Sequence, residues 1–177
     1  MSNDGNKVCC FTGHRPKLLR GGYIEEHSNC KQIKQLLQYE IIRLIEEYNV
    51  TTFISGMAQG VDIWAAEIVI NLKEDYQNIT LEAVLPCSSQ TRGWNVKYKE
   101  RYDRLLKLCD KVTCLQNEYS QNCMMKRNRY MVDMSDFVIA VWNGEPSGTA
   151  NTIKYAVKCR KQVIFIDANN YECIELS

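Results

Sequence analysis

The chain has 177 residues and a mass of 20.5 kDa, which is the size of a single domain. Its 22 Lys and Arg residues against 21 Asp and Glu residues give a net charge of +1, which argues against binding to nucleic acid or a membrane surface by bulk charge. No apolar run reaches the ~18 residues of a membrane span, and the first residues, MSNDGNK, contain no signal-peptide core. We therefore expect a cytoplasmic protein that does not bind a membrane.

Nine cysteines are a high and odd number for this length, and no two of them form a C-x-x-C pair. Several lie in apolar segments such as Val8-Cys9-Cys10-Phe11, where free cysteine packs as a small core residue. Only His14 and His27 could add imidazole ligands to a zinc site. We expect reduced thiols, no metal and no other cofactor.

Short apolar runs alternate with segments of helical periodicity along the whole chain. Strands are predicted at Val8–Thr12, Thr52–Ser55, Leu81–Leu85, Lys111–Leu115, Phe137–Trp142 and Val163–Asp167. Apolar residues at steps of three and four predict helices over about 33–48, 61–72, 98–109, 123–134 and 149–160, with Ser28 as the N-cap of the first. This order predicts an α/β fold: one Rossmann-like domain over residues 1–177, with a core over 7–168, whose mostly parallel sheet carries helices on both faces.

The unusual residues of the sequence gather directly after the predicted strands. The first strand leads into Gly13-His14-Arg15, the second into the segment 55–62, the third into the segment that holds Gln90 and Trp94, and the fifth into the segment 143–149. In an open parallel sheet, ligands bind in the crevice beyond the carboxyl ends of the strands. These four loops therefore predict one shared binding site.

Two of these loops are rich in glycine and open a helix, an arrangement that suits an anion. Glycine lets the backbone approach a ligand closely, and a helix N-terminus offers free N–H groups to a phosphate. The turn 144–149 would form a phosphate cradle with hydroxyls from Ser147 and Thr149, or else a simple β-to-α turn with Thr149 near the N-cap. The turn 56–62 matches neither G-x-G-x-x-G nor a P-loop. Its Asp62 either binds a nucleotide hydroxyl or is a carboxylate stabilised by the helix dipole.

Basic and aromatic residues near these loops allow two interpretations each. Arg15 offers bidentate donors to a phosphate, or it forms a solvated loop pair with His14. Trp94 either stacks on a base or covers an edge of the core. By its own chemistry, the run 126–129 (KRNR) is typical of a charged, solvated helix face.

Three segments in the same order carry a resemblance to a known family. They are FTGHRP at 11–16, SGMAQGVD at 55–62 followed by WAAE at 64–67, and Pro86 with Gln90 and Trp94. Together they resemble the YpsA-like family of the SLOG superfamily, a group of Rossmann-like nucleotide-ligand domains, over nearly the whole chain. The resemblance implies a small nucleotide-type ligand and a homo-oligomer, a dimer or larger.

Two other branches of the superfamily refine the site. The DprA branch carries Ser-Gly-x-Ala-x-Gly-hydrophobic-Asp and Arg-Asn-Arg segments, and the second of these implies that Arg127 and Arg129 contact bound phosphate or ribose. The LOG phosphoribohydrolases carry Pro-Gly-Gly-x-Gly-Thr-x-x-Glu, and this chain departs from that motif by placing Thr152 where the catalytic glutamate stands. Threonine is no general acid or base near neutral pH, so cleavage of a glycosidic bond would need Asp62 or Glu145.

Three functions follow, in the order in which the sequence favours them. The first is binding of a nucleotide-derived ligand, of the ADP-ribose or NAD type or a nucleoside phosphate, as a sensor or sequestering module rather than an enzyme. The second is hydrolysis of a nucleotide N-glycosidic bond. The third is regulation through a protein partner or single-stranded nucleic acid, although nucleic acid is not the partner we expect. The ligand-binding candidates are Gly13, His14, Arg15, Ser55, Gly56, Gly60, Asp62, Gln90, Trp94, Arg127, Asn128, Arg129, Asn143, Gly144, Ser147, Gly148 and Thr149.

Overall fold

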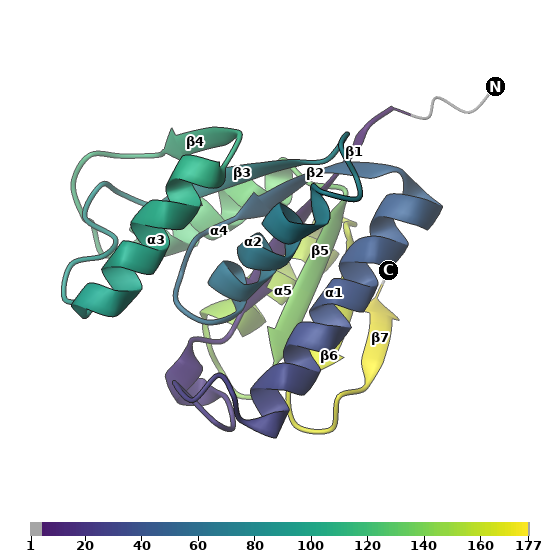
Figure 1. Ribbon diagram of the computed structural model, residues 1–177, viewed down its shortest axis with the longest axis horizontal. Helices are drawn as coiled ribbons and strands as arrows, with labels where there is room; N and C mark the ends of the chain where they lie inside the picture. Colours follow the sequence, from purple (N-terminus) through teal and green to yellow (C-terminus); the bar gives the residue numbers. More distant parts are fainter. Residues whose placement is uncertain (1–4, 177) are drawn as a thin grey trace.

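A seven-stranded sheet with helices on both faces forms the molecule (Figure 1). The computed structural model describes residues 5–176. Its strand order is β4-β3-β2-β1-β5-β6-β7, and every neighbouring pair is parallel except β6 and β7. The strands are β1 (Lys7–Gly13), β2 (Val50–Ser55), β3 (Thr80–Leu85), β4 (Lys111–Cys114), β5 (Phe137–Trp142), β6 (Gln162–Asp167) and β7 (Cys173–Leu176). The predicted α/β Rossmann-like fold is confirmed.

The helices divide into two layers, one on each face of the sheet. Helices α1 (Ser28–Tyr48), α2 (Val61–Leu72) and α3 (Val96–Leu108) lie on one face, and α4 (Cys123–Asp133) and α5 (Gly148–Lys158) lie on the other (Figure 1). Successive strand residues point to opposite faces, so Phe11 of β1 packs in the core under α1 and α2 while its neighbour Cys10 packs in the core under α4 and α5. Both faces are buried, which is why the central strands are apolar almost without interruption.

The order of the strands places a crevice between β1 and β5. From β1 the chain proceeds to β2, β3 and β4 on one side, and it then crosses to β5, β6 and β7 on the other. The loops that follow β1 and β5 therefore diverge, and open α/β sheets bind ligands at such a point. The predicted ligand loops after β1 and β5 meet there.

Three local features differ from the sequence-based predictions. The N-cap of α1 is His27 rather than Ser28, because the His27 Nδ1 accepts from the Asn29 N–H at 3.2 Å. A short 3-10 helix (Pro16–Leu18) follows β1. The sheet also continues past residue 168 into β7, whose four residues are all exposed. A segment this short gives too few apolar positions for a sequence pattern to identify it as a strand.

The remaining findings concern cysteines, metals and membranes. All nine cysteines are free thiols, and five of them are buried. Across residues 5–176, no group of three or more His, Cys, Asp or Glu side chains is arranged to hold a metal ion. None of the helices in that range is long and apolar enough to cross a membrane.

Candidate functional site

A cavity of about 180 Å³ lies at the carboxyl ends of β1 and β5. It is built from four separate segments: the end of β1 and the loop after it, the loop before α2 and its first turn, α4, and the start of α5. The predicted residues that line it are Gly13, His14, Arg15, Asp62, Arg127, Asn128, Ser147, Gly148 and Thr149. Sequence reasoning missed Leu18 and Met124, two apolar lining residues that no motif identifies.

The N-terminus of α5 supplies backbone donors to this cavity. Ser147 is the N-cap, and its Oγ accepts from the Ala150 N–H at 3.2 Å. The first amides of a helix have no partner within the helix, and no acceptor within residues 5–176 is found for the N–H groups of Gly148 and Thr149. A side chain at Gly148 would meet nothing within 4 Å, so the glycine leaves open space in front of the donors. This geometry suits a phosphate or another anion.

His14 lines the same cavity and is fully buried. Its Nε2 lies 2.5 Å from the Asn143 Oδ1, which also accepts from the Glu145 N–H, while the Asn143 amide nitrogen donates to the Leu18 carbonyl. With the amide oriented in this way, the ring hydrogen belongs on Nε2 even though the Asn143 N–H also points at that atom. Nδ1 is then buried without a partner among the described residues. Burial lowers the pKa of His14 from 6.5, and the Asn143 contact offsets part of that shift.

Asp62 and Arg127 form a buried charge pair at the back of the cavity. The Asp62 Oδ2 lies 3.6 Å from the Arg127 Nη1 and accepts weakly from the Ala58 N–H at 3.4 Å. Burial raises the pKa of Asp62, and Arg127 and the Ala58 N–H offset part of this shift. Arg127 also donates to the Gly56 carbonyl and, through Nε, to the Asn128 Oδ1 at 2.8 Å. Much of its hydrogen-bonding capacity is therefore used within the protein.

The second predicted loop acts by positioning rather than by lining the cavity. The Ser55 hydroxyl donates to the Asp62 carbonyl and accepts from the Met57 N–H, and the Gln90 side chain donates to the carbonyls of Gly56 and Met57. Ser55, Gly56 and Gly60 do not line the central cavity. Ser55 instead positions Asp62 through its hydrogen bond to the Asp62 carbonyl.

Both glycines of this loop are required by packing. A Cβ at Gly56 would collide with the Arg127 guanidinium, and Gly60 adopts φ +94° with the His14 carbonyl 2.6 Å from where a Cβ would stand. Their role is a close approach of backbone to neighbouring groups, the same property that the sequence suggested for a ligand.

Trp94 lies in an outer compartment of about 400 Å³ that shares Arg15 and Met124 with the cavity. Its other walls include Gln90, Arg92 and Tyr119. The Trp94 ring packs edge-on against Tyr102 with centroids 5.5 Å apart, so it covers the core edge and lines the compartment at once. The two interpretations of Trp94 are therefore compatible. Arg92, which follows the third strand in the same loop as Gln90 and Trp94, and Tyr119 were not among the predicted ligand-binding residues.

Several other predicted residues stand outside the cavity. Gly144 and Glu145 are exposed in the turn after β5 and do not line it. Asn143 does not line the cavity either, and its side chain contacts the His14 ring that does. Arg129 lies two residues from Arg127 on α4, and because residues two apart face different sides of a helix, it lines a separate groove. The Thr152 hydroxyl donates to the Gly148 carbonyl and accepts from the Asn128 amide.

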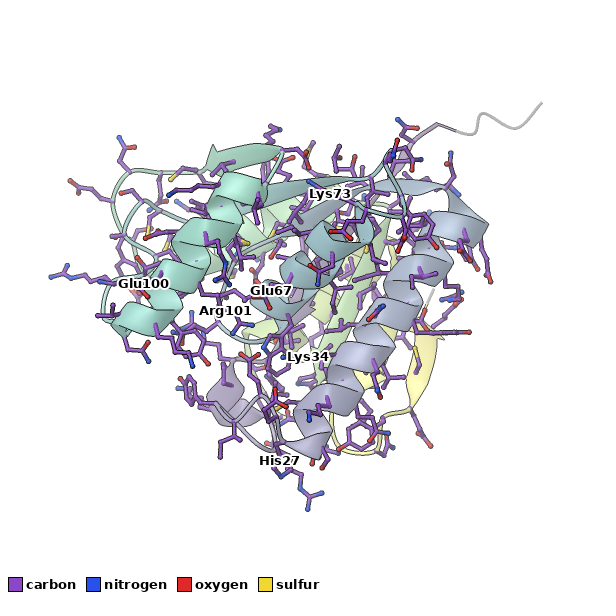
Figure 2. The ribbon with its side chains drawn as sticks, in the orientation of Figure 1. His27, Lys34, Glu67, Lys73, Glu100 and Arg101 are labelled. Carbon is purple, nitrogen blue, oxygen red and sulfur yellow. The ribbon has the colours of Figure 1, made fainter. Side chains whose placement is uncertain are left out.

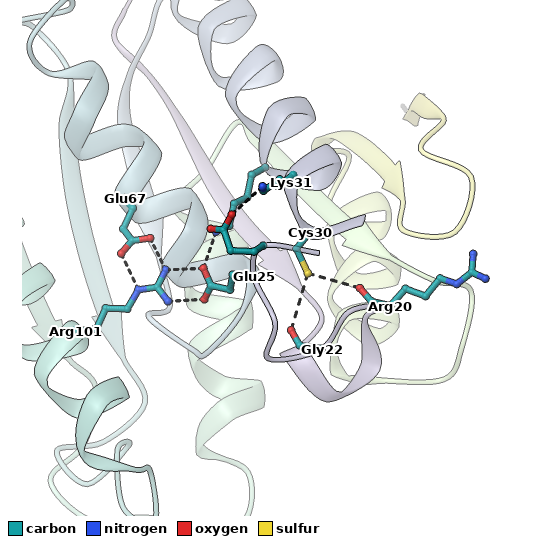
Figure 3. Close-up of polar contacts among 9 residues, drawn as sticks. Arg20, Gly22, Glu25, Cys30, Lys31, Glu67 and Arg101 are labelled. Atoms are coloured by element: carbon teal, nitrogen blue, oxygen red, sulfur yellow. Dashed lines mark hydrogen bonds and ion pairs between the residues drawn. The ribbon is translucent and has the colours of Figure 1, made fainter. Parts of the chain in front are cut away.

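The loop after β1 is clamped on the α1–α3 face by a cluster of ion pairs (Figure 3). Arg101 of α3 donates to both oxygens of Glu25 (2.5 and 3.1 Å) and to both oxygens of Glu67 (2.7 and 2.6 Å). Lys34 of α1 contacts Glu25 at 2.6 Å, and Figure 2 shows α2, which carries Glu67, between α1 and α3. Burial alone would raise the pKa of Glu25, but the bonds from Arg101 and Lys34 outweigh it and lower that pKa to about 2. This clamp steadies the loop that carries Arg15 and Leu18.

Comparison with known proteins gives a match over most of the chain. The family model YpsA, described as the YspA SLOG family, matches residues 9–174. This chain belongs to the YpsA family of the SLOG superfamily. UPF0398 proteins from Bacillus thuringiensis (strain Al Hakam) and Bacillus cereus (strain AH187) are each 28% identical to it over 159 residues, which cover 89% of this chain and 85% of each relative.

A solved structure resembles this YpsA-family chain in its fold. DNA processing protein A from Helicobacter pylori superposes with a TM-score of 0.62 and 20% sequence identity over 96% of this chain and 69% of that one. The published description of that protein concerns a single-stranded DNA binding mode. At this identity the likeness shows a shared fold. The expectation that nucleic acid is not a partner stays a prediction.

Proposed function

We propose that this YpsA-family protein binds a nucleotide-derived ligand, of the ADP-ribose or NAD type or a nucleoside phosphate, and acts as a sensor or sequestering module. The observation that carries the proposal is the convergence of unused donors on one cavity. The amides of Gly148 and Thr149 and the exposed Arg15 belong to its lining. His14 lines it as well, and its unpartnered Nδ1 becomes a further donor when the ring is protonated. A phosphate there would accept from several donors at once.

The size of the cavity indicates how the rest of the ligand lies. Small-molecule sites have volumes of about 300–1,000 Å³, and the central cavity, at about 180 Å³, is smaller. It has room for a phosphate and part of a ribose, with Asp62 as the acceptor for a ribose hydroxyl. The base would then occupy the outer compartment beside Trp94, which is reached past Arg15 and Met124.

The placement of the carboxylates favours binding over cleavage. Asp62 is the one acidic residue among the described residues of the cavity lining, and Arg127 and the Ala58 N–H hold it in place. Glu145 lies outside the cavity, and the Thr152 hydroxyl is occupied by two hydrogen bonds. A general acid must reach the leaving group, and among the carboxylates considered only Asp62 is near the proposed ligand.

The test is calorimetric binding of AMP, ADP-ribose, NAD and cyclic ADP-ribose to the wild-type chain and two glycine variants. Gly148→Leu places a side chain before the α5 donors, and we expect it to lower the affinity for the bound ligand by about 100-fold or more while the fold survives. Gly5→Leu adds the same side chain in open space away from the cavity and serves as the matched control.

Mass spectrometry of the same mixtures separates the alternatives. An intact bound ligand supports the proposal, and the mass of the complex also reports whether the protein is a homo-oligomer. Release of a free base would establish the hydrolase instead, and Asp62→Asn would then remove that activity. Unchanged affinity in a folded Gly148→Leu protein, or salt-dependent binding of single-stranded DNA with none of the four ligands bound, would overturn the proposal.

A further inference from the structure

A groove of about 590 Å³ runs between α4 and α5, next to the central cavity. The two spaces share Met124, Asn128 and Gly148 in their linings. The phosphate, ribose and base placed above, with the base beside Trp94, do not occupy this groove. It is nevertheless larger than the central cavity and opens directly from it.

The groove carries positive charge that no protein carboxylate neutralises. Arg129 reaches it from α4, and Lys154 and Lys158 reach it from α5. No acidic residue of the described chain lines it, and none of the three cations forms an ion pair within residues 5–176. Lys154 and Lys158 are four residues apart on one helix face, where like charges repel. An anion between the helices would relieve this repulsion.

The groove also contains a fixed aromatic ring. The Tyr155 ring lies 5.4 Å from the Arg129 guanidinium, and its hydroxyl donates to the Asp133 Oδ1 at 2.9 Å, which holds its orientation. Amide groups of Gln121 and Asn151 complete the polar lining. Cations, amides and an aromatic face together suit a phosphate with an attached ribose and base.

The central cavity thus adjoins two compartments, each with an aromatic residue and an arginine. One contains Trp94 and Arg92, and the other contains Tyr155 and Arg129. A mononucleotide would occupy the cavity and one compartment only. A molecule with phosphate in its middle and a nucleoside at each end would occupy all three spaces.

We propose that the α4–α5 groove binds the second nucleotide arm of a dinucleotide-type ligand, meaning two nucleosides joined through phosphate. This inference rests on the proposed function, because it takes the first phosphate to lie at the N-terminus of α5. Arg129, Lys154 and Lys158 contact the second phosphate or its ribose, and Tyr155 packs against the second base. The groove therefore sets the preference for a dinucleotide over its halves.

The test compares AMP with NAD in calorimetric titrations of three proteins. The first is the wild type, and the second is the double variant Lys154→Gln, Lys158→Gln, which neutralises the groove. The third is Lys97→Gln, Arg104→Gln, a matched control that removes the same charge from the groove beside α3 on the opposite face of the sheet. Both substituted lysines of α5 are exposed, so the double variant is expected to fold.

We expect the groove variant to weaken NAD binding about tenfold, the effect of one charge-assisted hydrogen bond, while its affinity for AMP stays within about twofold of wild type. The control pair should leave both affinities unchanged. Equal losses for AMP and NAD, or no loss for either, would overturn the groove assignment while the proposed function stands. If the folded wild type binds none of AMP, NAD, ADP-ribose and cyclic ADP-ribose, the proposed function is refuted instead.

A third titration with a 12-nucleotide single strand completes the design. If the strand binds more tightly than NAD and the groove variant abolishes this binding, the groove is a path for nucleic acid and the dinucleotide assignment is wrong. If the strand binds more weakly than NAD, the small-ligand assignment is supported.

Discussion

On the face covered by α1, α2 and α3, Arg101 lies between Glu25 and Glu67, and Lys34 adds a second cation to Glu25. On the face covered by α4 and α5, Arg129, Lys154 and Lys158 surround an open groove in which the described chain places no carboxylate. Both regions are rich in charge, yet only the first satisfies it internally. Paired charges fix the loop that walls the cavity, and unpaired cations leave binding capacity for a ligand.

The largest effect is expected at the paired cluster. Arg101→Ala leaves Glu25 and Glu67 half-buried beside each other without their shared cation, and we expect the free energy of unfolding to fall by about 2–3 kcal/mol. Urea denaturation measures the change. Lys73→Ala, which breaks the more exposed pair with Asp110 on the same face (Figure 2), should cost less than about 1 kcal/mol. Equal losses in the two variants would show that the cluster has no special importance.

The free energy of unfolding should depend on the protonation of Glu25 at acidic pH. Its pKa is lowered from 4.5 to about 2, so the ionised form is favoured in the folded protein. The stabilisation is complete above about pH 5. It is lost as the pH falls from about 5 to about 2, by about 2–3 kcal/mol in total. The Glu25→Gln variant should be less stable at pH 7 and should lose less stability between pH 5 and pH 2. Parallel curves for variant and wild type would contradict the assignment.

A smaller effect is expected for the pH dependence of ligand affinity in the central cavity, which His14 lines. Burial lowers the pKa of His14, so the ring is neutral at pH 7 and Nδ1 cannot donate. A bound phosphate favours the protonated ring, and NAD affinity should rise several-fold as the pH falls from 7.5 to 5.5. NAD is a suitable probe because the two charges of its pyrophosphate do not titrate in this range.

Two variants check the His14 prediction. His14→Gln should flatten the pH dependence, whereas Asp62→Asn should retain it. The second variant is needed because Asp62 lines the same cavity and its pKa is raised by burial. A flat profile in the Asp62→Asn protein alone would assign the titration to Asp62.

The smallest effect is a gain in stability, opposite in sign to the loss expected for Arg101→Ala. Replacing both Lys154 and Lys158 with Gln removes a like-charge pair at i, i+4, and we expect the free energy of unfolding to rise by about 0.2–0.5 kcal/mol. Thermal and urea denaturation without ligand measure this. A loss of stability would mean that the groove lysines support the fold, and the contrast between the two faces would fail.

Much of the fold followed from local patterns. Phe137–Trp142 is predicted and observed with the same ends, because six apolar residues bounded by polar turns leave little choice. The exposed edge strand β7 was missed for the opposite reason, since it buries no face. The segments of the site were also predictable, because glycine, histidine and arginine after a strand are unusual in any α/β chain.

The sequence could not assign a separate role to each of those residues. Arg127 and Arg129 stand in one motif, yet one pairs with Asp62 in the cavity and the other lines the groove beside Tyr155. Ser55 and Gln90 occur in the family motifs, yet their side chains hold the backbone of the loop before α2. Helical phase and long-range hydrogen bonds decide such roles, and neither is visible in a motif.

The sequence by itself determined the order of strands and helices, the edge of the sheet where the proposed site lies, and the residues gathered there, because these depend on short-range periodicity and on the chirality of parallel connections. The tertiary structure alone decided which donors remain free, which charges are paired, and that α4 and α5 enclose a basic groove. These properties depend on contacts between segments as far apart as His14 and Asn143. Such contacts form only once the strands have brought their carboxyl ends together.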